Sequence, residues 1–146
     1  MDKQYHPVEI EEKWSKVWSE RVISNKDSNT SFSQVIPPPN VTGTLHMGHS
    51  FQYAIMDFYT RYHHMSGKDA HWQVGADHAG IATQMVVENN LAKKDVTRLE
   101  LGREKFLDEV WSWKDYSEEK ITSQIKRLGC SVDWNKYRFT LDDGCN

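Results

Sequence analysis

The sequence predicts an α/β fold in which two parallel strands are joined by a helical crossover. Two short runs typical of strands, residues 32–36 and 70–74, flank a segment with helical periodicity. A strand, a helix and a strand of one sheet normally give parallel strands with a right-handed crossover. The turns after the two strands, residues 37–44 and 75–78, are therefore expected at one carboxyl edge, where open α/β sheets bind ligands.

The first predicted element is a helix over residues 8–22, in which Ile10, Trp14, Val17 and Trp18 share one apolar face. Residues 24–31 form a polar linker. The strand over residues 32–36 follows, and it ends at three consecutive prolines because missing amide protons cannot continue a ladder of hydrogen bonds.

The crossover helix is predicted from about residue 45 to residue 65, with Thr44 as its candidate N-cap. Five large side chains repeat at helical spacing in this segment, so we expect them to form its buried face: Phe51, Ile55, Phe58, Tyr59 and Tyr62. Gly67 is placed to end the helix before the second strand.

Three further helices are predicted over residues 79–92, 98–114 and 118–128. Thr97 and Glu100 have the spacing of a capping box at the start of the second of these. Residues 130–146 have only a weak pattern.

Composition excludes several classes of protein. The net charge is −3, which is unlike a nucleic-acid binder driven by a broad basic surface. No apolar run is long enough to span a membrane, and the first residues lack the apolar region of a secretory signal. Two cysteines cannot build a disulfide framework, and free thiols favour a cytoplasmic location.

The first unusual cluster follows the first strand. His46 and His49 are three residues apart at the start of the crossover helix, so their imidazoles share a face near the positive end of the helix dipole. Two such donors suit a polyphosphate, and Gly48 between them exposes backbone on which a flat base can stack. The alternative, a polar helix start with two solvated histidines, has equal weight on this spacing.

The second cluster follows the second strand. Asp77 can hold a substrate ammonium group there, whereas the commoner role of an aspartate at this place is to cap the next helix. It can do both only if one carboxylate oxygen stays free. A third possibility is a zinc site of a metal-dependent hydrolase, with His46, His49, Asp77 and His78 as ligands.

Three stretches, in order, resemble the valyl-tRNA synthetase branch of the class I aminoacyl-tRNA synthetases. Residues 37–49, PPPNVTGTLHMGH, contain the equivalent of the "HIGH" motif at residues 46–49. Residues 77–84, DHAGIATQ, and residues 127–134, RLGCSVDW, are also similar to the valyl enzymes. Ser50 and Ala76 replace residues that are more often Ala and Thr in that family.

The resemblance implies the first half of a Rossmann-like nucleotide-binding domain, with helices before and after it, that activates L-valine with ATP and Mg²⁺ and transfers it to tRNA(Val). It implies that His46 and His49 are catalytic. It assigns the ATP site to Thr44, His46, Gly48 and His49. It assigns the amino-acid site to Pro37, Pro38, Asn40 and Asp77. It implies no resident metal.

The resemblance also sets expected boundaries. Residues 1–31 are expected to form a helical extension and linker, and residues 32–146 the first half of the catalytic domain. The family's editing insertion and its Lys-Met-Ser-Lys-Ser loop have no counterpart here, so the chain is expected to be an N-terminal portion that is inactive alone. A non-catalytic nucleotide-binding paralogue is the alternative.

Overall fold

A computed structural model describes residues 4–19 and 27–145, and the chain divides into two compact units. The first unit contains residues up to 36 together with 46–74 and 123–137. The second unit contains residues 37–45, 75–122 and the segment from 138 onward. The predicted strand–helix–strand element lies in the first unit, and both of the loops predicted to bind ligands lie in the second.

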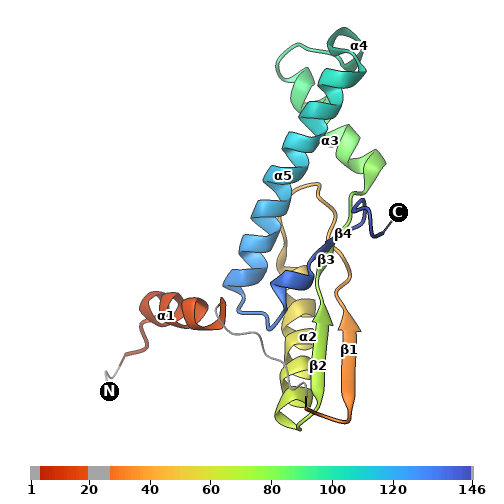
Figure 1. The fold of residues 1–146 in the computed structure, drawn as a ribbon. Coiled ribbons are helices and arrows are strands. Elements are labelled where there is room, and N and C mark those ends of the chain that lie inside the picture. The colour runs from red at the N-terminus through yellow and green to blue at the C-terminus, as the bar shows by residue number, and fades with distance from the viewer. Residues whose placement is uncertain (1–3, 20–26, 146) are drawn as a thin grey trace. The chain divides into compact units, whose positions relative to one another are not determined.

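The predicted parallel pair of strands is confirmed in the first unit (Figure 1). β1 (Ser31–Val35) pairs with β2 (Asp69–Gln73) in parallel, with Ser31 opposite Asp69. The crossover helix α2 (Met47–Met65) lies against both strands. Its N-cap is His46 rather than the predicted Thr44, because the His46 imidazole accepts a hydrogen bond from the start of the helix.

The predicted buried face of α2 is wrong. Phe51, Phe58 and Tyr62 are 70%, 65% and 57% exposed, and Ile55 and Tyr59 are also exposed. The buried residues of this helix are Tyr53 and Thr60. Helical spacing identifies residues that share a face, but it does not determine which face the strands cover.

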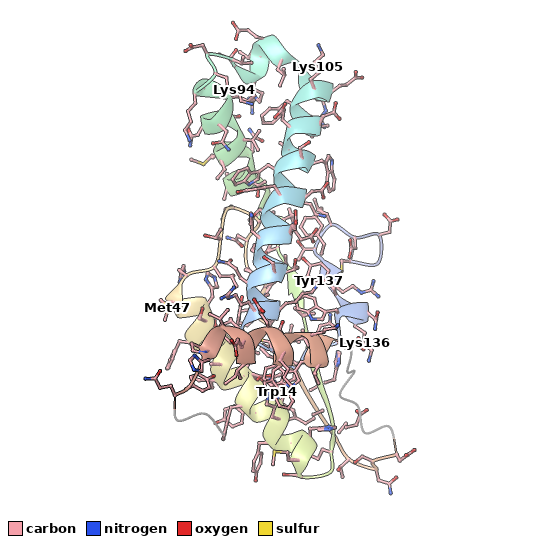
Figure 2. The ribbon with its side chains drawn as sticks, turned by 90° about the vertical axis from the view of Figure 1, so that its left-hand side faces the viewer. Trp14, Met47, Lys94, Lys105, Lys136 and Tyr137 are labelled. Atoms are coloured by element: carbon pink, nitrogen blue, oxygen red, sulfur yellow. The ribbon has the colours of Figure 1, made fainter. Side chains whose placement is uncertain are left out.

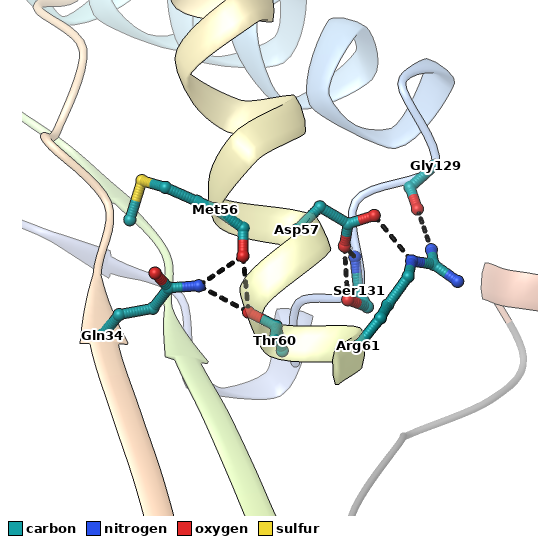
Figure 3. A network of polar contacts seen from close by, with 7 residues as sticks. All are labelled: Gln34, Met56, Asp57, Thr60, Arg61, Gly129 and Ser131. Atoms are coloured by element: carbon teal, nitrogen blue, oxygen red, sulfur yellow. Dashed lines mark hydrogen bonds and ion pairs between the residues drawn. The ribbon is translucent and has the colours of Figure 1, made fainter. Parts of the chain in front are cut away.

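A polar network joins α2 to β1 and to the loop after α5 (Arg103–Arg127), as Figure 3 shows. Gln34 Nε2 donates to the Met56 carbonyl at 2.6 Å and to Thr60 Oγ1 at 2.5 Å. On the other side of the helix, Asp57 accepts hydrogen bonds from the backbone N–H and hydroxyl of Ser131.

Arg61 extends this network. Its Nε lies 2.6 Å from Asp57 Oδ2, and its Nη2 donates to the Gly129 carbonyl at 2.7 Å. The guanidinium also lies over the ring of Trp18, which belongs to α1 (Pro7–Ser19). Gly129 has φ +72°, and a Cβ there would lie 2.6 Å from the Trp18 ring, so the loop requires glycine on both grounds.

The predicted end of the first helix, residues 20–22, lies outside the described residues.

The second unit contains a second, very short parallel pair, β3 (Gly75–Ala76) with β4 (Arg138–Phe139). The backbones approach so closely that a Cβ at Gly75 would lie 2.5 Å from the Arg138 carbonyl oxygen. Residues 130–146 have only a weak sequence pattern, which predicts neither β4 nor the 3₁₀ turn η1 (Trp134–Lys136).

Helices α3 (Gly80–Ala92) and α4 (Arg98–Leu101) precede α5. Figure 2 shows that Lys94, after α3, and Lys105, near the start of α5, lie at the same end of these two helices. A buried cluster joins the two long helices, formed by Val87, Leu91 and Phe106. The capping box of Thr97 and Glu100 is confirmed.

The predicted break between residues 114 and 118 does not occur, since α5 is one continuous helix. Residues 103–127 contain no glycine or proline. Lys114 and Glu118, which flank the expected break, form an i, i+4 ion pair at 2.6 Å. The interruption falls at Gly102 instead, with φ +79°.

Among the described residues, no helix is both long and apolar enough to cross a membrane.

Candidate functional site

The two loops predicted to bind ligands lie side by side in the second unit. The backbone N–H of Asp77 donates to the Pro39 carbonyl at 2.9 Å, and the Val41 N–H donates to the Asp77 carbonyl at 3.0 Å. Asn40 and Asp77 thus form an isolated parallel bridge. The structure brings these two predicted site residues together, as expected for neighbouring parallel segments that end at one edge.

Helix α5 fixes the first of these loops from the other side. Trp113 Nε1 donates to the Val41 carbonyl at 3.0 Å, and the buried hydroxyl of Ser117 donates to the Gly43 carbonyl at 2.8 Å. Two carbonyl groups of an irregular loop therefore have side-chain donors. Pro37, Pro38 and Asn40 remain exposed, while Pro39 is buried.

The Asp77 carboxylate is held through one oxygen. Its Oδ1 accepts from the Ala79 backbone N–H at 2.8 Å and lies 3.3 Å from the Thr140 hydroxyl. Within the described part of the chain, Oδ2 makes no hydrogen bond. The side chain is 38% exposed, so the carboxylate is partly accessible to a ligand.

The helix after Asp77 begins in an unusual backbone conformation. The N-cap of α3 is Ala79, which has φ +42° and no side-chain cap, so the expectation that Asp77 itself is the cap is wrong. A non-glycine residue in this left-handed region costs about 1–2 kcal/mol. The hydrogen bond from Ala79 N–H to Asp77 stabilises that conformation and satisfies the amide.

His46 and His49 lie in the first unit, where they cap α2 together. The Gly48 N–H donates to His46 Nδ1 at 3.1 Å, and the His46 N–H donates to His49 Nδ1 at 3.3 Å. The two ring centroids are 4.0 Å apart, so the predicted shared face is confirmed. Because both Nδ1 atoms accept, each neutral ring carries its proton on Nε2.

Burial lowers the pKa of His49 from its ordinary value of 6.5, and the neighbouring His46 lowers it further. The neutral ring that the capping box requires is therefore favoured near neutral pH. Gly48 has a steric role as well: a Cβ there would lie 2.9 Å from His46 Cε1. Thr44, His46 and Gly48 are exposed.

The geometry gives the metal hypothesis no support, because no group of three or more His, Cys, Asp or Glu side chains among the described residues is placed to hold a metal ion. The predicted convergence of the histidine pair with Asp77 spans the two units and stays a prediction. The sequence patterns do not identify Trp113, Ser117 or Thr140 as residues of the site. For Thr140, the only signal is the pairing of β3 with β4, two strands that lie far apart in the sequence.

Comparisons with known proteins identify the family of this chain. The family described as "tRNA synthetases class I (I, L, M and V)" matches residues 9–146. A valine–tRNA ligase from Acinetobacter baylyi is 57% identical over 96% of this chain, which spans 14% of that relative. A valine–tRNA ligase from Aquifex aeolicus is 52% identical over 97% of this chain, which spans 12% of it.

A solved structure shares the fold. The crystal structure of a ternary complex of LeuRS, tRNA and LeuAMS from Agrobacterium radiobacter K84 matches 97% of this chain with a TM-score of 0.75 and 19% identity, over 17% of that protein. The parallel strands and their crossover helix are thus those of the first part of a Rossmann-like synthetase domain. The chain belongs to the class I tRNA synthetase family.

Proposed function

We propose that this chain carries the ATP-binding and amino-acid-binding loops of a valine–tRNA ligase. That enzyme would activate L-valine with ATP, release pyrophosphate, and transfer the valyl group from the adenylate to tRNA(Val). Relatives that are named valine–tRNA ligases and are more than half identical over nearly the whole chain support the specificity. The observation that carries the proposal is the Asp77 carboxylate, with one oxygen held by the protein and one free.

In this proposal the free Oδ2 of Asp77 pairs with the ammonium group of L-valine. Asn40, which bridges to Asp77 through the backbone, and the exposed Pro37 and Pro38 line the rest of the amino-acid site. An ionised acceptor makes a stronger hydrogen bond than a neutral one, so the carboxylate anchors the substrate by its charged end.

ATP, carried as its magnesium complex, would bind at the start of α2. His46 and His49 both accept hydrogen bonds at Nδ1, so each offers an Nε2–H donor to the phosphates. The positive end of the helix dipole adds to the attraction. Gly48 leaves room for the base, and Thr44 lies just before the helix.

This arrangement lets the chain act by position and charge. No covalent enzyme intermediate is required when the valine carboxylate attacks the α-phosphorus directly. The imidazole donors would stabilise charge that grows on the phosphates in the transition state. Because the chain spans 12% and 14% of the relatives described above, we expect weak binding and no useful aminoacylation by this chain alone.

The test is a titration of the nitrogen-15-labelled chain with L-valine, followed by NMR at the amides around Asp77. Asp77→Asn should weaken valine binding about 10- to 100-fold, since a bond to a charged group is worth about 1.5–3 kcal/mol. Asp108→Asn, on the exposed surface of α5, makes the same charge change and should bind normally. Normal binding by Asp77→Asn contradicts the ammonium site.

A second measurement separates the catalytic function from nucleotide binding alone. Valine-dependent exchange of pyrophosphate into ATP requires adenylate formation. Exchange that is lost in Asp77→Asn supports the proposed activity. ATP binding without exchange favours the non-catalytic paralogue, and aminoacylation near the low end of typical turnover, about 1 s⁻¹, contradicts the expectation of inactivity.

A further inference from the structure

The hydroxyl group of Thr140, which is distant in sequence, contacts both Asp77 and His78 in the turn after β3. Thr140 Oγ1 accepts a hydrogen bond from the His78 backbone N–H at 2.9 Å. The same oxygen lies 2.5 Å from His78 Nδ1 and 3.3 Å from Asp77 Oδ1. Thr140 is 62 residues from His78 in sequence, so folding alone brings them together.

The backbone holds Thr140 at this place. Its N–H donates to the Ala76 carbonyl at 3.2 Å and continues the β3–β4 pairing by one residue. The residue before it, Phe139, is buried, and its N–H donates to Asp142 Oδ2 at 2.8 Å. His78 is held as well, because the buried Thr83 hydroxyl donates to its carbonyl at 2.6 Å.

The single hydroxyl proton of Thr140 can go to only one of its two neighbours. If His78 carries its proton on Nδ1, the ring donates to Oγ1, and the hydroxyl proton is left for Asp77 Oδ1. If Nδ1 is unprotonated, the hydroxyl donates to the ring and Asp77 loses this bond. The first arrangement makes all three contacts of Oγ1 hydrogen bonds, with two donors to the oxygen and one proton from it to the carboxylate. In the second arrangement Asp77 Oδ1 keeps the Ala79 N–H but not the hydroxyl.

We infer that Thr140 is a positioning residue for the amino-acid site: its hydroxyl fixes the Asp77 rotamer and the His78 tautomer, so that Asp77 Oδ2 is left for the substrate ammonium. This inference rests on the proposed function of Asp77. Oδ1 has two protein donors, Ala79 N–H and Thr140 O–H, which orient the carboxylate before a ligand arrives. Preorganisation of this kind lowers the cost of binding.

The experiment compares Thr140→Val, which keeps the shape and removes the hydroxyl, with Thr140→Ser, which keeps the hydroxyl. Thr122→Val is the matched control, since among the described residues the Thr122 hydroxyl bonds only within α5, to the Glu118 and Glu119 carbonyls. The probes are L-valine and 3-methylbutanoate, which lacks the ammonium group. The readouts are amide NMR shifts during titration and the nitrogen-15 shifts of the His78 imidazole.

Thr140→Val should weaken L-valine binding about fivefold, the loss expected for one hydrogen bond, and leave 3-methylbutanoate binding unchanged. Thr140→Ser should bind L-valine within about twofold of the unsubstituted chain, and Thr122→Val should bind it normally. His78 should be the Nδ1–H tautomer in the unsubstituted chain and in Thr140→Ser, and should lose this preference in Thr140→Val.

The outcomes separate the two claims. If Asp77→Asn abolishes valine binding and Thr140→Val binds normally, the role of Thr140 is wrong and the ammonium site stands. If Asp77→Asn binds normally, the ammonium site is wrong. An Nε2–H tautomer of His78 in the unsubstituted chain overturns the role of Thr140 whether or not any variant folds, because the hydroxyl would then donate to the ring.

Discussion

His49 caps the helix on which it lies by accepting a hydrogen bond from the backbone of His46. The distance from the His46 nitrogen to His49 Nδ1 is 3.3 Å, and His46 Nδ1 in turn accepts from the Gly48 N–H at 3.1 Å. The two imidazoles proposed to bind ATP thus also start α2. Capping fixes the proton of each ring on Nε2. Both the capping and the proposed binding of phosphates use the neutral ring.

Acidification should destabilise the chain partly through His49. Its pKa is lowered, chiefly by burial, so the unfolded chain takes up a proton at this residue at a higher pH than the folded chain does. Stability from this group is therefore present above about pH 6.5 and is lost as the pH falls below that value. Urea unfolding at several pH values measures this dependence of the free energy of unfolding on pH.

His49→Gln provides the comparison, because glutamine at this position can complete a capping box without titrating. The free energy of unfolding of His49→Gln should fall less between about pH 7.5 and pH 5.5 than that of the unsubstituted chain. Equal pH dependence of the two chains would contradict the assignment.

Gly48→Ala should displace the His46 ring but change the free energy of unfolding only slightly. The new Cβ would lie 2.9 Å from His46 Cε1, so the ring must move and its cap is lost, at a cost of about 1 kcal/mol. Alanine in place of glycine within a helix gains about 1 kcal/mol, which nearly offsets that cost. We expect a small change in urea unfolding, a shifted His46 NMR signal and weaker ATP binding.

Gly144→Ala is a suitable control for that substitution, because nothing lies within 4 Å of a Cβ at Gly144. It should leave the His46 signal unchanged. An unmoved His46 ring in Gly48→Ala would show that the glycine is not needed for the cap.

The polar network around Asp57 predicts an order of stabilities. Asp57→Ala removes the partner of Arg61 and of two Ser131 donors, and should cost about 2–3 kcal/mol. Ser131→Ala keeps the backbone N–H donor and should cost about 1 kcal/mol. Urea unfolding tests the order, with the exposed Asp108→Ala expected within about 0.5 kcal/mol of the unsubstituted chain. The reverse order would show that the network does not hold α2.

The two thiols should react very differently with a disulfide reagent at about pH 8. Burial raises the pKa of Cys130 to about 12, and the nearby Asp57 carboxylate adds to the rise, whereas Cys145 is exposed. One thiol should therefore react quickly in the folded chain and both in urea, because the thiolate is the reactive form. Fast modification of Cys130 without unfolding would contradict this environment.

The parts of the fold that follow from local pattern could be predicted from the sequence. Strand-like runs on either side of a long helical segment predict β1, α2 and β2, and the parallel rule predicts that the turns after the two strands lie at one edge. The bridge between Asn40 and Asp77 agrees with that prediction. The cap of α2 was predicted at Thr44 because hydroxyl side chains are the usual caps. An imidazole Nδ1 can accept the same bond, and here His46 does so.

Contacts between distant segments could not be predicted in this way. β3 and β4 have two residues each, which is too short for a periodic signal, yet their register decides where Thr140 lies. The stripe from Phe51 to Tyr62 shows the same limit, since spacing alone does not say which face of a helix is covered.

The pairing of β3 with β4 also has a consequence for how the protein is made. The ribosome releases Asp77 and His78 well before Thr140, and at about 5–20 residues per second the delay is roughly 3 to 12 s. During that interval the carboxylate lacks one of its two donors, and the amide and ring of His78 lack their hydroxyl partner. The turn that contains Asp77 and His78 therefore reaches its final geometry only after residue 140 has been translated.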